Sequence, residues 1–210
     1  NYYSVKKNSR SSIPYILKKE IKNELINLQW TIMFELLYEL DIIDSKSTSI
    51  NLLYLSNKSS TTYKNELNCI QYYLAKYRKN PTLKYKISHP KKFKDVLKER
   101  ENYMISATAN TQSLIINTSL SKNSQSIYSN LVNILHILPK QGSMIFKLEL
   151  PIVHPSLMNL LYICYQYFGK FIIYKPIQEA YTNNFYLIGK YFQELPEELL
   201  SHLIYVSLNY

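Results

Sequence analysis

Short apolar runs alternate with amphipathic helical patterns along this chain, and the alternation limits the possible folds more than any other feature. Seven apolar runs bounded by polar residues predict strands, at 50–56, 83–88, 102–106, 113–117, 143–149, 171–175 and 185–192. Apolar residues at helical spacing predict helices within 15–41, at 64–79, 91–100, 127–138 and 157–168, and from about 196 onward. Gly169 is expected to close the helix at 157–168.

This order of elements predicts an α/β protein with a doubly wound, mostly parallel sheet of seven strands. Only about nine residues separate the last two predicted strands, which is too few for a helical crossover. We therefore expect those two strands to form an antiparallel hairpin, so that one strand near the end of the sheet runs against the others.

The chain has three glycines in 210 residues, against an ordinary frequency of roughly 7%. Gly142, Gly169 and Gly189 all lie in the last third. A loop that wraps phosphate or a nucleotide with its backbone needs glycine, because a β-carbon would block the close approach. No such glycine-rich loop can therefore occur before residue 142.

The length suits one α/β domain, which we place at 15–210 after a basic arm or linker at 1–14. The chain starts with Asn1, and we expect it to be part of a longer polypeptide. No apolar run is long enough to span a membrane. Cys69 and Cys164 fall in apolar helical patterns, as expected for buried thiols in a reducing, cytoplasmic compartment. The four histidines lack zinc-ligand spacing, so no metal site is expected.

The formal net charge is +10, which favours an anionic partner, with nucleic acid as the first candidate. The segment 76–100 holds ten Lys or Arg residues and has several tyrosines nearby. Its candidate RNA-binding residues are Lys76, Arg78, Lys79, Lys84, Lys86, Lys91, Lys92 and Lys94. The alternative is a solvated surface in a chain whose Asn, Lys, Ile and Tyr content reflects AT-rich codons. Both interpretations stay open.

The stretch 138–192 resembles the FtsJ family of ribose 2'-O-methyltransferases, most closely its members from the capping systems of large DNA viruses. It reads LPKQGSMIFKLEL, then a helix ending in YFGKFIIYKP, and then TNNFYLIGKYF. The spacing of these motifs over about 55 residues is close to that of the family. Upstream, WTIMFELLYEL resembles the helix that opens the family's domain. The resemblance implies a Rossmann-like, class I methyltransferase fold with an antiparallel C-terminal strand.

The resemblance also implies a Lys-Asp-Lys-Glu tetrad, in which the central lysine deprotonates or orients the ribose 2'-hydroxyl for methylation. Lys147 stands at the central position and is the only tetrad residue retained. The other three positions fall at Ile32, at Asn117 or Thr118, and at Asn184. We therefore expect Lys147 to have lost the acidic partners that would aim it and tune its pKa.

The S-adenosylmethionine site that the resemblance implies departs from the family pattern as well. The loop at 56–62 reads SNKSSTT where the family has an acidic, glycine-rich sequence. The family's acidic ribose-binding residue is missing from KISHPKK at 86–92, and Ile177-Gln178-Glu179 replaces its Ser-Arg. We expect 56–62 to cap or fill the ancestral pocket, with Ser60, Thr61 or Thr62 capping the next helix. No bound cofactor is therefore expected.

Three functions remain open. The first is a catalytically degenerate methyltransferase-fold module that acts as a scaffold or RNA-binding part of a viral mRNA capping or transcription protein. Its partners would be RNA or other domains and subunits of that assembly, in the host cytoplasm or the virion, with no membrane. The second function is an active, S-adenosylmethionine-dependent cap ribose 2'-O-methyltransferase with a divergent site. The third is a purely structural protein-interaction domain.

Overall fold

A computed structural model describes residues 26–55, 62–88, 110–118, 123–152 and 154–209. Several predicted features lie outside these ranges: the arm at 1–14, the first part of the helical stretch at 15–41, the basic helix at 91–100 and the strand at 102–106. The predicted loop at 56–62 does so as well, with its cap candidates Ser60 and Thr61, except for Thr62, which is the first residue of a helix. Six of the seven predicted strands fall within the described residues and are present there.

These six strands form one sheet, in the order β2-β1-β3-β4-β6-β5. Their bounds are Ser49–Leu55 (β1), Thr82–Ser88 (β2), Thr111–Asn117 (β3), Ser143–Glu149 (β4), Phe168–Tyr174 (β5) and Asn184–Phe192 (β6). Neighbours from β2 to β4 pair in parallel, whereas β6 is antiparallel to both β4 and β5. The predicted hairpin of β5 and β6 is confirmed, and the sheet has the mostly parallel, Rossmann-like layout.

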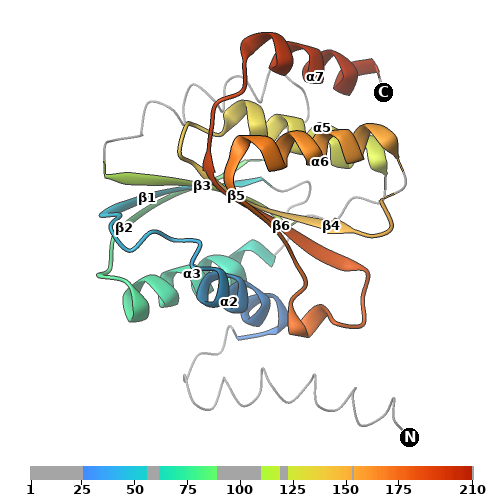
Figure 1. Cartoon of the computed structure of the whole chain (residues 1–210). Helices are drawn as coiled ribbons and strands as arrows, with labels where there is room; N and C mark the ends of the chain where they lie inside the picture. Colours follow the sequence, from blue (N-terminus) through green and yellow to red (C-terminus); the bar gives the residue numbers. More distant parts are fainter. Residues whose placement is uncertain (1–25, 56–61, 89–109, 119–122, 153, 210) are drawn as a thin grey trace, which may run out of the picture.

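Helices cover both faces of the sheet (Figure 1). One face carries α2 (Leu28–Leu40) and α3 (Thr62–Tyr77), and the other carries α5 (Ser124–Ile137), α6 (Pro155–Tyr167) and α7 (Glu197–Asn209). A short 3-10 helix, η1 (Ile177–Glu179), joins β5 to β6. Each face has its own apolar core, and side chains alternate between the two along every central strand. Cys69 and Cys164 are buried free thiols, as predicted.

Local sequence signals set the ends of several helices. The side chain of Asn27 accepts a hydrogen bond from the Trp30 backbone N–H and so caps α2. Asn123 caps α5 through the backbone N–H of Gln125. Pro155 occupies the first turn of α6, where its missing N–H costs no helical hydrogen bond.

The expectation that Gly169 closes α6 is wrong. The helix ends at Tyr167, Phe168 already has extended backbone angles, and Gly169 lies inside β5. A β-carbon on Gly169 would lie 3.1 Å from the β-carbon of Tyr191 on the neighbouring strand. Glycine therefore meets a requirement for close strand approach here rather than for a left-handed helix end.

Replacing Gly189 with alanine is expected to destabilise the sheet by about 1–3 kcal/mol, because it forces extra volume into a packed core. A β-carbon at this position would lie 2.5 Å from the Phe168 ring, which is buried. Urea denaturation would measure the loss. The double variant Gly189→Ala with Phe168→Leu should recover part of it, since the smaller side chain makes room. Equal unfolding midpoints for wild type and the single variant would contradict this account.

Candidate functional site

Lys147 lies near the carboxyl end of β4 and points toward the α2/α3 face of the sheet. Its neighbours Phe146 and Leu148 point into the core on the opposite face, as the alternation of a strand requires. The Lys147 Nζ donates a hydrogen bond to Oε1 of Glu179 at 2.7 Å. The side chains are 12% and 5% exposed, respectively, so the two charges form a largely buried ion pair.

Glu179 belongs to η1, which is held in place by α2. Glu35 of α2 accepts hydrogen bonds from the Tyr174 hydroxyl at 2.9 Å and from the Ile177 backbone N–H at 2.8 Å. These contacts fix the start of η1 and direct its last residue toward Lys147. The Lys175 Nζ also donates to the carbonyl oxygen of Thr182, which holds the following turn.

Three donors converge on the carboxylate of Glu179. Besides Lys147, the Thr182 hydroxyl donates to its Oε2 at 2.5 Å and the Asn184 Nδ2 donates to the same oxygen at 2.7 Å. Burial alone would raise the pKa of Glu179, but these hydrogen bonds and the nearby ammonium outweigh it and lower the pKa below its usual range. Glu179 is therefore held as a carboxylate.

The expectation that Lys147 has no acidic partner is wrong. The resemblance places the tetrad glutamate at Asn184, but the carboxylate that contacts Lys147 belongs to Glu179, five residues earlier. Asn184 instead donates a hydrogen bond to that carboxylate. Glu179 was noted only as a departure from the family sequence. One sequence signal could have revealed it, because Glu179 is the only acidic residue between β5 and β6.

A second buried carboxyl group, Glu66 of α3, lies at the carboxyl ends of β1 and β3. The hydroxyls of Tyr54 and Thr118 both donate to its Oε2, at 2.5 and 3.0 Å, and also contact each other. Burial raises the pKa of Glu66 to about 7, although these hydrogen bonds and the positive charge of Lys147 act in the opposite direction. The Tyr54–Glu66–Thr118 network thus joins three separate elements through one shared oxygen.

This network lies where doubly wound sheets usually bind ligands. The strand order reverses between β1 and β3, and ligands of such sheets bind outside the carboxyl ends of the strands at that point. Here Tyr54, near the end of β1, and Thr118, just after β3, are joined by Glu66, and Tyr54 and Glu66 are only 5% and 4% exposed. The described residues at this position therefore form a hydrogen-bonded side-chain network that is buried at Tyr54 and Glu66.

The remaining tetrad positions do not supply the family's side chains. Ile32 is buried in the apolar core beneath the sheet and offers no amine. Asn117 is buried at the end of β3, and Thr118 serves Glu66. The site consequently contains one lysine and two carboxyl groups, with both acids reaching it from positions outside the family motif.

The candidate RNA-binding residues are only partly brought together. Lys76 and Lys79 are exposed around the end of α3, and Lys84 and Lys86 are exposed on β2, beside the half-exposed ring of Tyr85. Arg78 instead pairs with Asp41 and lies over the Tyr73 ring. Lys91, Lys92 and Lys94 lie outside the described residues.

Two further properties concern the described part of the chain alone. None of its helices combines the length and apolar character needed to cross a membrane. Its His, Cys, Asp and Glu side chains form no group of three or more that could hold a metal ion.

No protein-family model and no curated protein matches the sequence. Among solved structures, the chain is similar to a release factor-specific protein-(glutamine-N5) methyltransferase from Alicyclobacillus acidocaldarius, with 8% identity and a TM-score of 0.42. That similarity covers 78% of this chain and 93% of the other. This chain is also similar to an rRNA methylase from Streptococcus thermophilus, with 11% identity and a TM-score of 0.35. That similarity covers 81% of this chain and 98% of the methylase. Identities this low concern the arrangement of the chain alone.

Proposed function

We propose that this chain is a catalytically degenerate, FtsJ-like methyltransferase-fold module that serves as a scaffold or RNA-binding part of a viral mRNA capping or transcription protein. The observation that carries the proposal is the Tyr54–Glu66–Thr118 network. It occupies the switch point of the sheet with the buried side chains of Tyr54 and Glu66, which hydrogen-bond to each other and to Thr118. A module that bound S-adenosylmethionine there would have to break these hydrogen bonds and expose a buried carboxyl group.

The sequence around this network supports the same proposal. No glycine precedes residue 142, so every residue between the end of β1 and Gln141 carries a side chain. The exposed Lys76, Lys79, Lys84 and Lys86 favour RNA among the anionic partners.

Titration of the intact chain with S-adenosylmethionine in a calorimeter is expected to give no saturable heat. The reason is the closed network at the switch point, together with the missing acidic partner for the ribose hydroxyls. A thermal-shift measurement with S-adenosylhomocysteine provides an independent readout and should show no stabilisation, since a ligand that binds only the folded state must raise its stability. Binding of either compound at micromolar affinity would contradict the proposal.

The ion pair of Lys147 and Glu179 favours a second candidate, an active cap ribose 2'-O-methyltransferase with a divergent site. A lysine aimed by a carboxylate is the arrangement that the family uses, even though Glu179 comes from another position. Methyl transfer to capped RNA would test this candidate, with Lys147→Ala and Lys147→Arg as variants. Activity that is present in wild type and lost in Lys147→Ala would establish it, and equal activity in both would remove Lys147 from catalysis.

Salt-dependent RNA binding separates the RNA-binding module from a purely structural domain. Each phosphate that a Lys or Arg side chain neutralises releases counterions, so the affinity falls steeply with salt. A plot of log affinity against log salt should have a clearly negative slope, made shallower by Lys84→Ala with Lys86→Ala. A slope near zero would support the structural alternative.

A further inference from the structure

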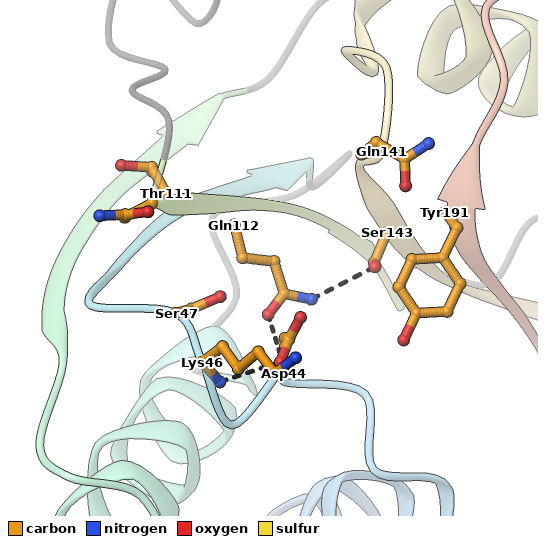
Figure 2. A pocket seen from close by; sticks show the side chains of 9 residues that line it. Asp44, Lys46, Ser47, Thr111, Gln112, Gln141, Ser143 and Tyr191 are labelled. Atoms are coloured by element: carbon orange, nitrogen blue, oxygen red, sulfur yellow. Dashed lines mark hydrogen bonds between the residues drawn. The ribbon is translucent and has the colours of Figure 1, made fainter.

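A polar pocket opens at the amino-terminal edge of the sheet, opposite the carboxyl ends discussed above (Figure 2). Its volume is about 220 Å³, below the roughly 300–1,000 Å³ of pockets that hold whole cofactors or drug-sized ligands. The loop before β1 contributes one wall through Asp44, Lys46 and Ser47. Gln141 and Tyr191 stand on the opposite side.

Two lining residues adopt a backbone conformation that side chains normally avoid. Gln141 has φ 64° and Tyr191 has φ 59°, both in the left-handed region. For a bulky residue inside a strand this is a strained conformation, and such strain is concentrated at functional sites. Gly169 leaves room for the Tyr191 β-carbon, and the Gln141 N–H donates to the Phe192 carbonyl at 2.7 Å. The neighbouring strand thus accommodates an unfavourable tyrosine, whose side chain lines the pocket and is 43% exposed.

At the floor of the pocket, both polar atoms of the Gln112 side-chain amide are engaged in hydrogen bonds. Its Oε1 accepts from the Asp44 backbone N–H at 2.8 Å, and its Nε2 donates to the Ile42 carbonyl at 2.8 Å and to the Ser143 hydroxyl at 3.3 Å. Figure 2 shows the bonds to Asp44 and Ser143, which connect the loop before β1 to β3 and β4. Asn110 and Gln141 also line the pocket, and the amide of each side chain carries both donors and an acceptor.

Several lysines lie in and around this pocket, beside the carboxylate of Asp44. Lys46 lines it, and the exposed Lys140 and Lys170 belong to the segments next to Gln141 and Tyr191. The buried Lys190 places its ammonium 5.3 Å from the centre of the Tyr191 ring and donates to the Asp41 carbonyl. Strand β2, which carries the exposed Lys84 and Lys86, lies three strand positions from β4, or roughly 15 Å.

We propose that this pocket binds one unpaired base of single-stranded RNA. Tyr191 stacks on the base, and the amides of Gln141 and Asn110 hydrogen-bond to its edge, which is how proteins commonly read splayed-out bases. In this proposal Lys46, Lys140 and Lys170 contact the flanking phosphates. The inference rests on the RNA-binding part of the proposed function and assigns it to the amino-terminal edge, away from the Lys147 site.

Two variants of Tyr191 test the pocket without endangering the fold. Tyr191→Gly removes the ring and, because glycine accepts positive φ, retains the backbone conformation. Tyr191→Phe keeps the stacking surface. With a short fluorescein-labelled oligouridylate at fixed salt, fluorescence anisotropy should show Tyr191→Gly weakening Kd by about 5- to 150-fold. Tyr191→Phe should remain close to wild type, and far-UV circular dichroism should be unchanged in both.

A second measurement distinguishes failure of the pocket from failure of RNA binding in general. Uridine monophosphate is titrated into isotope-labelled protein, and shifts of the backbone amides of Gln141, Ser143 and Tyr191 are followed by NMR. Such shifts, together with weaker RNA binding by Tyr191→Gly, support the pocket. Equal RNA affinity in wild type and Tyr191→Gly overturns it while leaving RNA binding intact. Shifts without any RNA binding retain the pocket and reject the RNA-binding role, and the absence of both effects rejects both.

Discussion

Replacing Glu179 with glutamine is expected to lower the free energy of unfolding by about 3–5 kcal/mol, the usual cost of removing one partner of a buried ion pair. The variant keeps the shape of the side chain but leaves the Lys147 ammonium without its carboxylate in a largely buried position. It also changes the acceptor for Thr182 and Asn184. Chemical denaturation at neutral pH would measure the loss.

Glu39→Gln is the matched control, because Glu39 is exposed on α2 and its replacement should change stability by no more than about 0.5 kcal/mol. The double variant Glu179→Gln with Lys147→Met should recover much of the loss, since no uncompensated charge then remains. If Glu179→Gln were as stable as Glu39→Gln, the ion pair would not hold η1 against the sheet.

The pH dependence of this pair has a definite sign. The folded state lowers the pKa of Glu179, so its contribution is fully present above the ordinary value near 4.5 and is lost as the pH falls through the lower, folded-state value. Acid should therefore destabilise wild type more than Glu179→Gln. Parallel acid-unfolding profiles for the two proteins would contradict that assignment.

Glu66→Gln is expected to stabilise the protein at pH 8 by about 3 kcal/mol. The folded state raises the pKa of Glu66 from 4.5 to about 7, so stability is fully present below 4.5 and is lost as the pH rises toward and through 7. Because one pKa unit corresponds to about 1.4 kcal/mol, this gap amounts to about 3 kcal/mol. Glutamine stays neutral, and its carbonyl oxygen can accept from both Tyr54 and Thr118.

Unfolding free energies measured between pH 4.5 and 8 would test this prediction. Wild type and the exposed control Glu39→Gln should lose stability together over that range, whereas Glu66→Gln should change much less. A glutamine variant that follows the wild-type profile would mean that Glu66 ionises in the folded protein as an exposed acid does. The network at the switch point would then have to be more open than its burial indicates.

The order of strands and helices could be predicted from the sequence, because it depends on burial patterns that repeat over a few residues. Strand residues alternate between two faces and helix residues recur about every 3.6 positions, so the core-facing positions are visible in the chain itself. The nine-residue connection before β6 also excluded a parallel crossover. Gly169 was misread because a glycine after a helical pattern resembles a helix end, whereas its actual constraint is Tyr191 on another strand.

The chemistry of the site could be predicted only in part. Lys147 was identified from its position in a motif, but its partner Glu179 lies 32 residues away on a turn whose path depends on Glu35 of α2. Tyr54, Glu66 and Thr118 were not identified as a group, since their nearest members are 12 residues apart and the others more than 50. No local pattern distinguishes these side chains from ordinary surface or core residues.

The sequence by itself determined the alternating elements, the hairpin of β5 and β6, and the absence of a glycine-rich loop before residue 142. Each of these features depends only on residues that are close together in the chain. Only the tertiary structure decided that Glu179 faces Lys147 and that Tyr191 takes a left-handed conformation beside Gly169. Strand register and loop path set these relations. A shift of one residue in β4 or β6 would turn Lys147 or Tyr191 to the opposite face, since strand side chains alternate with a period of two.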